Sequence, residues 1–417
     1  MPKKYTANDR LNSVNSSGPG QLSELTQMSK KLPNSRGRMP KMSRISKPSG
    51  ALVVVLAVAC VAWTSQHSEA QGRGAGPSMT PSALRASPAE TTAAKAKDPN
   101  WKAPRTPWGH PDLEGTWTSD DMRGIPTSRP AAQGERESLT PEEFARRAGG
   151  DEASRDRAVN QETILRNEFG VRTFGYTSFI VDPSNGQMPA LTQAALSRRK
   201  AIANQGTFGG GPWDDFDDFT LYDRCITRGV PGSVMPVLYG NGLRIMQTPN
   251  EVVISYEMVH DTRIIPLDGR PHIGPGIRQY MGDARGHFEG DTLVVETTNF
   301  MGNTTGVGGN GGGAPTSDVL HVIERITRVA ADVLNYEVSI TDPKTYSKPV
   351  KLLLPLTTQP GYQVLPYECH EGNHAMHNIL SAARAEDRTV EDAVKKGLPR
   401  PKPSSWLGGV NPAAPEQ

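Results

Sequence analysis

Two histidines and a glutamate near the C-terminus have the spacing of a zinc-binding motif. Residues 367–380 read YECHEGNHAMHNIL, so His370, Glu371 and His374 form a literal H-E-x-x-H. On one continuous helix, residues four apart project from the same face, and both imidazoles could then bind one zinc ion. The glutamate would act as the general base on the bound water. One candidate function is therefore a zinc-dependent hydrolase with His370 and His374 as metal ligands.

The residues inside the motif argue against that helix. Gly372 and Asn373 are poor residues for a helix interior, costing up to about 1 kcal/mol each relative to alanine. Asparagine is favoured instead as an N-cap, and a helix that begins at Asn373 would leave His370 outside it. No recognisable third zinc ligand follows in the sequence. We therefore expect a structural His/Glu cluster at a helix entry and keep the zinc hydrolase as the alternative.

A second concentration of polar side chains lies in the stretches YEMVHDTRIIPLDGRPH and IRQYMGDARGHFEGD. If alternate residues of the preceding strand face inward, Glu257, His260 and Asp261 lie at its end, at the mouth of a barrel. A histidine beside carboxylates could act there as a general acid or base. The competing interpretation is salt bridging among exposed loop charges. The candidate ligand-binding residues around this site are Trp117, Tyr256, Arg263, Arg278, Tyr280, Arg285 and His287.

The elements that must position these residues are mostly short strands. After about residue 235 the chain contains runs such as EVVISYEMV, HFEGDTLVVETTNF and DVLNYEVSITD, rich in Val, Ile and Thr and separated by turn residues. Residues 248–250 and 289–291 are short enough to connect hairpins. Alternate positions in 319–328 and 333–341 are apolar, which predicts an antiparallel sheet with one face in a core. Such a meander protects its edges by closing as a barrel or by pairing with a second sheet.

Helix signals occur before and after this strand-rich region. Thr140-Pro141-Glu142-Glu143 has the pattern of a capping box with proline at the first helical position. Residues 189–206 are helical in composition, so we expect a helical insertion at about 140–205. C-terminal helices should follow residue 373, with a second capping box at Thr389–Asp392 and a stop at Gly397.

The N-terminal region predicts export. Residues 51–63, ALVVVLAVACVAW, are uninterruptedly apolar but too short to span a bilayer comfortably. Basic residues precede the run, and Ser68 and Ala70 follow it at the spacing that signal peptidase prefers. We expect cleavage before Gln71, no stable membrane span afterwards, and a periplasmic or secreted protein.

Composition and cysteine usage agree with that assignment. The chain has 417 residues and a net charge of +2, which does not favour a nucleic-acid partner. After signal removal only Cys225 and Cys369 remain, in a compartment that permits disulfides. Two free thiols are the other possibility. A Cys225–Cys369 bridge would stabilise the fold by about 4 kcal/mol in the chain-entropy model.

Three stretches carry resemblances to known families. Gly115-Thr116-Trp117, followed by up-and-down hairpins, resembles the G-x-W that begins the first strand of lipocalins and related calycin barrels. That resemblance implies a tryptophan packed across the closed end of a barrel. The stretches GDTLVVETTNF and YECHEGN are similar to those of a large group of secreted bacterial proteins, a resemblance that implies export and a β-rich fold and names no reaction.

Together these patterns predict a mainly β protein, an antiparallel meander closing as a lipocalin-like barrel or a two-sheet sandwich. The expected parts are an N-terminal extension and signal peptide (1–70), a disordered tether (71–105), one β-rich domain with a helical insertion (106–400) and a flexible tail (401–417). The expected function is binding, with transformation as a further option, of a small and largely apolar molecule. No cofactor is expected except zinc in the hydrolase alternative. A structural envelope protein without a ligand is the third hypothesis.

Overall fold

The computed structural model describes residues 101–160, 170–201, 213–302, 307, 314–359, 361–399 and 401 of the chain. All of them belong to the unit Gly76–Gln417. The expected signal peptide and most of the expected tether lie outside the described residues. The last tether residues, 101–105, are described: Arg105 forms a β-bridge with Pro111 and an ion pair with Asp291.

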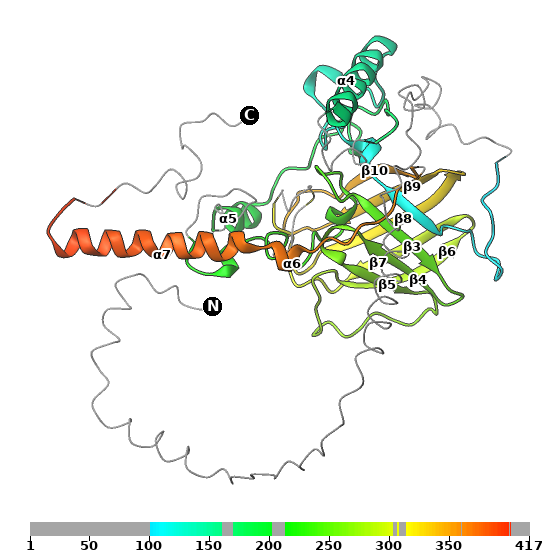
Figure 1. Cartoon of the computed structure of the whole chain (residues 1–417). Helices are drawn as coiled ribbons and strands as arrows, with labels where there is room; N and C mark the ends of the chain where they lie inside the picture. Colours follow the sequence, from blue (N-terminus) through cyan, green and yellow to red (C-terminus); the bar gives the residue numbers. More distant parts are fainter. Residues whose placement is uncertain are drawn as a thin grey trace, which may run out of the picture. The chain divides into compact units, whose positions relative to one another are not determined.

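The described strands form one sheet that nearly closes into a barrel (Figure 1). Nine of them follow one path in the order β5-β4-β3-β1-β10-β9-β8-β7-β6, and β2 pairs with β10 outside that path. Every pairing between named strands is antiparallel. The strands are β1 (Gly115–Thr118), β2 (Ile180–Asp182), β3 (Gly242–Gln247), β4 (Glu251–Tyr256), β5 (Thr262–Pro266), β6 (Asp283–Glu289), β7 (Thr292–Thr298), β8 (His321–Ala330), β9 (Val333–Thr341) and β10 (Val350–Thr357).

The mainly β, barrel-like fold predicted from the sequence is therefore confirmed. Tight turns connect β3 to β4 and β6 to β7 at the two predicted positions, and Gly290 in the second turn has a φ of +59°. Positive φ strains most side chains but not glycine, so this residue suits the turn. The period-two pattern also holds. The inward positions of β4 (Val252, Ile254 and Tyr256) are buried, as are Leu334, Tyr336, Val338 and Ile340 of β9.

The two ends of the strand path, β5 and β6, meet along a seam. A Cβ atom added to Gly286 of β6 would lie 2.8 Å from the Cγ2 atom of Ile265 in β5. It would also lie 3.0 Å from the Cδ2 atom of Leu267, so a larger residue at position 286 would require these side chains to shift. Glycine therefore permits the close approach that brings the sheet almost to closure.

A charged pair inside the barrel ties β5 to strands on the other side of this seam. The Arg263 guanidinium donates from Nη1 and Nη2 to the two Glu324 oxygens of β8, at 2.8 and 2.6 Å. Nη2 also donates to Thr297 Oγ1 of β7 at 3.0 Å, and Tyr336 of β9 donates its hydroxyl to Glu324 at 2.8 Å. The side chains of Arg263 and Glu324 are 3% and 0% exposed. With Tyr256 of β4, which accepts from Arg263 Nη1 at 3.3 Å, five strands are joined through one buried network.

The pKa of each ionisable group in this network depends on the charge of its neighbours. Burial is the largest single influence and would lower the pKa of Arg263, but Glu324, Tyr256 and Tyr336 together raise the pKa well above the usual value. Burial raises the pKa of Tyr256, which accepts a hydrogen bond from Arg263, to about 12. Arg263 therefore stays cationic and Tyr256 stays neutral, which matches the hydrogen bonds observed.

Trp117 of β1 lies in the barrel core. Its indole Nε1 donates to the Leu113 carbonyl at 3.0 Å, and the Arg328 guanidinium lies 5.3 Å from the ring centroid. Such an arrangement supplies a cation–π contact and satisfies the only polar atom of a buried indole.

Helices lie in the insertion between β1 and β3 and after β10. They are α4 (Pro141–Asn160), α5 (Gln193–Ala201), α6 (Cys369–Gly372) and α7 (His374–Lys395), with short 3-10 turns η3 (Asp120–Met122), η4 (Ala131–Gln133), η6 (Phe216–Asp218), η7 (Gly232–Val234) and η8 (Met258–His260). The predicted insertion is confirmed by α4 and α5. The capping box is present, since Thr140 N donates to Glu143 Oε2 at 2.8 Å and Glu143 N donates to Thr140 Oγ1 at 3.3 Å.

The prediction of a second capping box at Thr389–Asp392 is wrong. Helix α7 runs through these residues without a break, and Thr389 Oγ1 donates to the Ala385 carbonyl one turn earlier. A threonine can satisfy its hydroxyl in this way inside a helix, so the sequence pattern did not mark a helix start. Gly397, with a φ of +66°, follows the end of α7 as expected.

No helix among the described residues is long and apolar enough to cross a membrane.

Breaking the Arg263–Glu324 pair should destabilise the barrel strongly. Glu324→Gln leaves the Arg263 charge buried without a counter-charge, so the free energy of unfolding should fall by about 3 kcal/mol or more. The matched control is Arg325→Gln on the same strand, whose ion pair with Glu289 is exposed. That control should cost less than about 1 kcal/mol. Urea denaturation of both variants measures the difference, and similar small losses would contradict the role assigned to the buried pair.

Candidate functional site

Two of the residues predicted at the barrel mouth, Glu257 and His260, contact the C-terminal segment, residues 361–373, which precedes α7. Glu257, which follows β4 directly, is 3% exposed. Its Oε1 accepts from the Leu365 amide at 2.8 Å, and its Oε2 accepts from the Gly242 amide at 3.1 Å and from the Tyr362 hydroxyl. The carboxylate thereby joins the start of β3 to the C-terminal segment.

His260 contacts the same segment. Its Nε2 accepts a hydrogen bond from the Tyr367 amide at 2.7 Å, so Nε2 carries no proton in this arrangement. The lone pair that a general base would use is therefore engaged. Asp261 beside it is half-buried, and burial raises the pKa of this carboxyl while a hydrogen bond from Thr227 opposes the shift. The structure brings the predicted catalytic residues to one end of the barrel, where two of them hold the C-terminal segment.

Unusual backbone conformations surround this end of the barrel. Among the described residues, Cys225, Val259, His260 and Asn299 are the non-glycine residues with positive φ, and Val259 has a φ of 68°. A β-branched residue rarely adopts this conformation, and such strain persists only where neighbouring contacts enforce it. Cys225, Val259 and His260 belong to segments that the C-terminal segment contacts. Strain of this kind is concentrated at functional sites.

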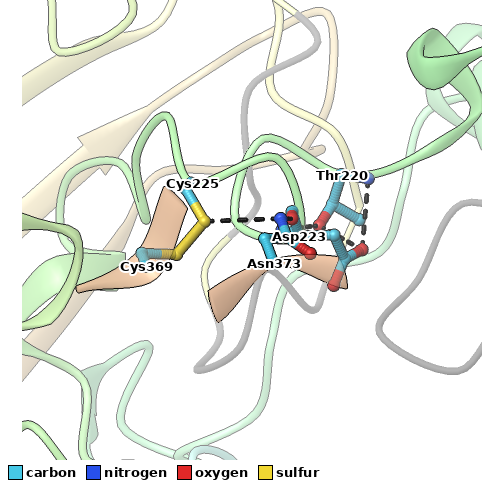
Figure 2. The surroundings of a disulfide bond; sticks show 5 residues. All are labelled: Thr220, Asp223, Cys225, Cys369 and Asn373. Carbon is cyan, nitrogen blue, oxygen red and sulfur yellow. Dashed lines mark hydrogen bonds between the residues drawn. A yellow bond between two sulfur atoms is a disulfide. The ribbon is translucent and has the colours of Figure 1, made fainter. Parts of the chain in front are cut away.

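A disulfide fixes the C-terminal segment to the barrel domain (Figure 2). Cys225 and Cys369 are bonded, with a Cα–Cα distance of 5.8 Å, so the predicted pairing is confirmed. Asn373 adds a second attachment, because its Nδ2 donates to the Asp223 carbonyl at 2.7 Å and to Cys225 Sγ at 3.4 Å. Asn373 stands at the N-cap position of α7, but its side chain caps no helix amide and binds the 223–225 loop.

A cavity of about 320 Å³ lies beside this disulfide. Its volume is at the lower end of the range for small-molecule sites. Two phenol rings, two carboxylates, the disulfide and the start of the C-terminal helices line it. These residues are Tyr222, Asp223, Cys225, Tyr367, Glu368, Cys369, Gly372 and Asn373.

A tyrosine cluster supports one wall of the cavity. Tyr222, Tyr239 and Tyr367 share hydrogen bonds through their hydroxyls, and burial raises the pKa values of Tyr222 and Tyr367. Arg228 is charged and almost fully buried near these rings, and it donates to the Met235 carbonyl at 2.6 Å. Burial lowers the pKa of Arg228 to about 10, against the opposing influence of Tyr222 and Tyr367. The hydroxyls of Tyr222 and Tyr367 therefore remain protonated at neutral pH, and Arg228 remains cationic.

The predicted ligand-binding residues do not form one site. Tyr256 and Arg263 belong to the buried network inside the barrel, and Trp117 lies in the core. Arg278 donates to the carbonyls of Phe300 and Asp318, Arg285 pairs with Asp283, and His287 pairs with Glu289. Tyr280 is half-buried. Tyr256 and Arg263 are buried inside the barrel, Arg278 and Tyr280 lie in the connection between β5 and β6, and His287 of β6 is exposed.

The geometry required by the zinc hydrolase alternative is not found. Helix α6 ends at Gly372 and α7 begins at His374, with Asn373 between them at φ −82° and ψ 56°. His370 and His374 therefore do not share one continuous helix, and both are exposed, as is Glu371. The described residues contain no group of three histidine, cysteine or acidic side chains placed to hold a metal ion. Asn373 stands at the N-cap position of α7, as expected from the sequence, so His370 lies outside that helix.

A second polar cavity, of about 200 Å³, was missed by the sequence reasoning. Its lining residues are Asp120, Asp121, Arg123, Gly124, Asp151, Ser154 and Arg172. Asp121 is buried and accepts from the amides of Val171 and Arg172 at 2.6 and 2.8 Å. Asp120 accepts from Thr118 Oγ1 at 2.6 Å and from Asn241 Nδ2 at 2.8 Å. The only local signal was an acidic doublet directly after a strand, and its partners are distant in sequence.

Asp120 has a strongly perturbed ionisation. Burial raises the pKa of its carboxyl to about 7, against the hydrogen bonds from Thr118 and Asn241, which favour the charged form. The neighbouring Asp121 carboxylate raises the pKa further. A carboxyl that titrates near neutral pH beside a cavity is a general feature of proton-transfer sites, and it also occurs in structural clusters.

Comparison of the chain with protein-family models, with curated proteins and with solved structures finds no match. The site must therefore be interpreted from its own residues.

The raised pKa of Asp120 predicts a pH-dependent stability. Between pH 4 and pH 7 the folded state holds a proton on Asp120 that the unfolded state has released, so this residue's contribution to stability falls as pH rises through that window. Asp120→Asn removes the titration. We compare the free energy of unfolding of the wild type with that of the variant at each pH. The difference, wild type minus variant, should decrease by a few kcal/mol between pH 4 and pH 8, on the order of 1.4 kcal/mol for each unit of pKa shift. Urea denaturation across this range gives the difference, and a flat difference would show that Asp120 ionises normally.

Proposed function

We propose that this chain is an exported barrel protein that binds a small, largely apolar molecule in the cavity beside the Cys225–Cys369 disulfide. The observation that carries the proposal is the cavity itself, with a volume of about 320 Å³ and walls that include two tyrosine rings. Aromatic walls with a few polar groups are typical of small-molecule sites, because the rings supply apolar area and the polar groups fix orientation.

The way in which the cavity is held supports binding. One side belongs to the 222–225 loop and the other to residues 367–373, and a disulfide joins the two sides. Covalent attachment limits the motion of the walls, so less ordering is required when a ligand enters. The backbone is strained at Cys225, which lines the cavity, and at His260, whose Nε2 accepts from the amide of the lining residue Tyr367. A cavity built only by imperfect packing would not require this degree of constraint.

This location differs from the site expected inside the barrel. The barrel interior around Arg263 and Glu324 is occupied by side chains that hydrogen-bond to one another. The candidate residues Glu257 and His260 contribute indirectly, since both hold the segment that carries Tyr367. The proposal therefore concerns binding, and no reaction is assigned to the site.

Export rests on the signal-peptide pattern of residues 42–70 and on the disulfide. Disulfides form and persist in oxidising compartments, so a cystine that attaches the C-terminal segment suits a periplasmic or secreted protein. The resemblance of GDTLVVETTNF and YECHEGN to stretches of secreted bacterial proteins supports the same location.

The neutral fluorophore N-phenyl-1-naphthylamine tests whether the cavity binds an apolar molecule. We expect its fluorescence to rise on addition of the folded protein and expect Gly372→Leu to weaken binding at least tenfold. Gly372 is an exposed residue of the cavity lining, and a Cβ atom there meets nothing within 4 Å, so a larger side chain adds bulk at the lining without distorting the walls.

Gly276→Leu is the matched control, because a Cβ atom at Gly276 also meets nothing within 4 Å and this residue does not line the cavity. This variant should bind the fluorophore as the wild type does, and both variants should keep the wild-type melting temperature within a few degrees. Absence of binding by the wild type would favour the structural envelope protein. Equal binding by Gly372→Leu would place the site elsewhere.

Export predicts a processed N-terminus. Protein recovered from the cell envelope or medium of a bacterial host should begin at or near Gln71 when its N-terminal sequence is determined, because signal peptidase cleaves after small residues such as Ala70. Full-length protein retained in the cytoplasm would contradict export. The folded state of that protein would still allow the fluorophore experiment, so the two parts of the proposal are tested separately.

A further inference from the structure

The cavity beside the disulfide contains a carboxylate without a cationic partner. Asp223 Oδ2 accepts from the Thr220 amide at 3.2 Å and from the Thr220 hydroxyl at 2.7 Å. Within the described residues, Oδ1 accepts no hydrogen bond and no ion pair involves Asp223, which is half-buried. Figure 2 shows the side chain beside Thr220 and close to the Asn373 attachment. A half-buried carboxylate with one unused oxygen has capacity for a donor from outside the protein.

The other described lining residues favour a positive charge on that donor. They comprise a second carboxylate, Glu368, the rings of Tyr222 and Tyr367, and no lysine or arginine. The faces of phenol rings attract cations, and a desolvated cation gains most from them. Arg228, which interacts electrostatically with both rings, does not line the cavity and donates to the Met235 carbonyl.

Burial also affects the acid itself. It raises the pKa of Asp223, against the two hydrogen bonds from Thr220 that lower it. A bound cation would favour the charged form and lower the pKa again, so binding and deprotonation of Asp223 are linked. Affinity for a cation should therefore fall as the pH drops through the pKa of this carboxyl.

We propose that the cavity selects an organic cation, a small molecule with an ammonium group on an apolar body, with Asp223 as its counter-ion and Tyr222 and Tyr367 as its walls. This inference rests on the proposed small-molecule function and names the ligand class. In the complex, the ammonium group donates to Asp223 Oδ1, and the apolar body contacts the phenol rings and the disulfide.

A charged and a neutral probe of the same shape test the selection. Isothermal titration calorimetry at pH 7.5 should show 2-phenylethylammonium binding at least tenfold more tightly than 2-phenylethanol. Asp223→Asn keeps the shape and an acceptor for Thr220, and it should reduce the cation's advantage to less than threefold. Glu371→Gln removes a nearby exposed charge that does not line the cavity and should leave the ratio unchanged.

The outcomes separate this inference from the function on which it rests. Equal affinities of the wild type for both probes would overturn cation selection, and binding of N-phenyl-1-naphthylamine would still support the apolar site. Failure of all three probes would refute both proposals. If Asp223→Asn does not fold, the wild type decides alone. Loss of the cation's advantage at acid pH would support the counter-ion, and a ratio that does not change with pH would overturn it.

Discussion

The buried ion pair between Arg263 and Glu324 is the contact on which closure of the barrel depends. The strand path begins with β5 and ends with β6, and a sheet left open there would expose two edges. Arg263 extends from β5 to Glu324 of β8 and Thr297 of β7, while Tyr336 of β9 satisfies the same carboxylate. A buried pair of this kind gives little net stability over apolar packing. Its effect is to exclude other arrangements, because any shift of β5 would leave both charges buried without partners.

Closure of the barrel also determines where the C-terminal segment can bind. Glu257, at the end of β4, accepts from the Gly242 amide at the start of β3 and also from the Tyr362 hydroxyl and the Leu365 amide. His260 and the disulfide then attach residues 367 and 369, so three separate contacts hold one short stretch. The cavity proposed as the binding site lies between this stretch and the 222–225 loop. Its walls therefore depend on pairings between residues more than a hundred positions apart.

The residues predicted from the sequence and those observed around the cavity agree only in part. Glu257 and His260 were singled out as acid–base candidates, and they lie at the expected end of β4 but hold neighbouring backbone. The sequence does contain a signal for Glu324. It lies between Val322 and Ile326 in the alternating pattern, which places its carboxylate on the inward face of the strand. Tyr222 and Asp223 offered no such signal. They lie in an irregular loop, where no periodicity shows which side chains are buried or which distant residues they meet.

What the sequence by itself determined was local. Alternating apolar residues specified the strands and their inward faces, the Thr140–Glu143 pattern specified the start of α4, and Asn373 marked the break that separates His370 from His374. Each depends on backbone geometry and near neighbours, so a short stretch contains enough information. The tertiary structure alone decided that Arg263 meets Glu324, that Asp120 is buried beside Asn241, and that Tyr222 and Tyr367 face one cavity. Desolvation and pairing of charges depend on everything packed around a side chain, and those neighbours come from distant parts of the chain.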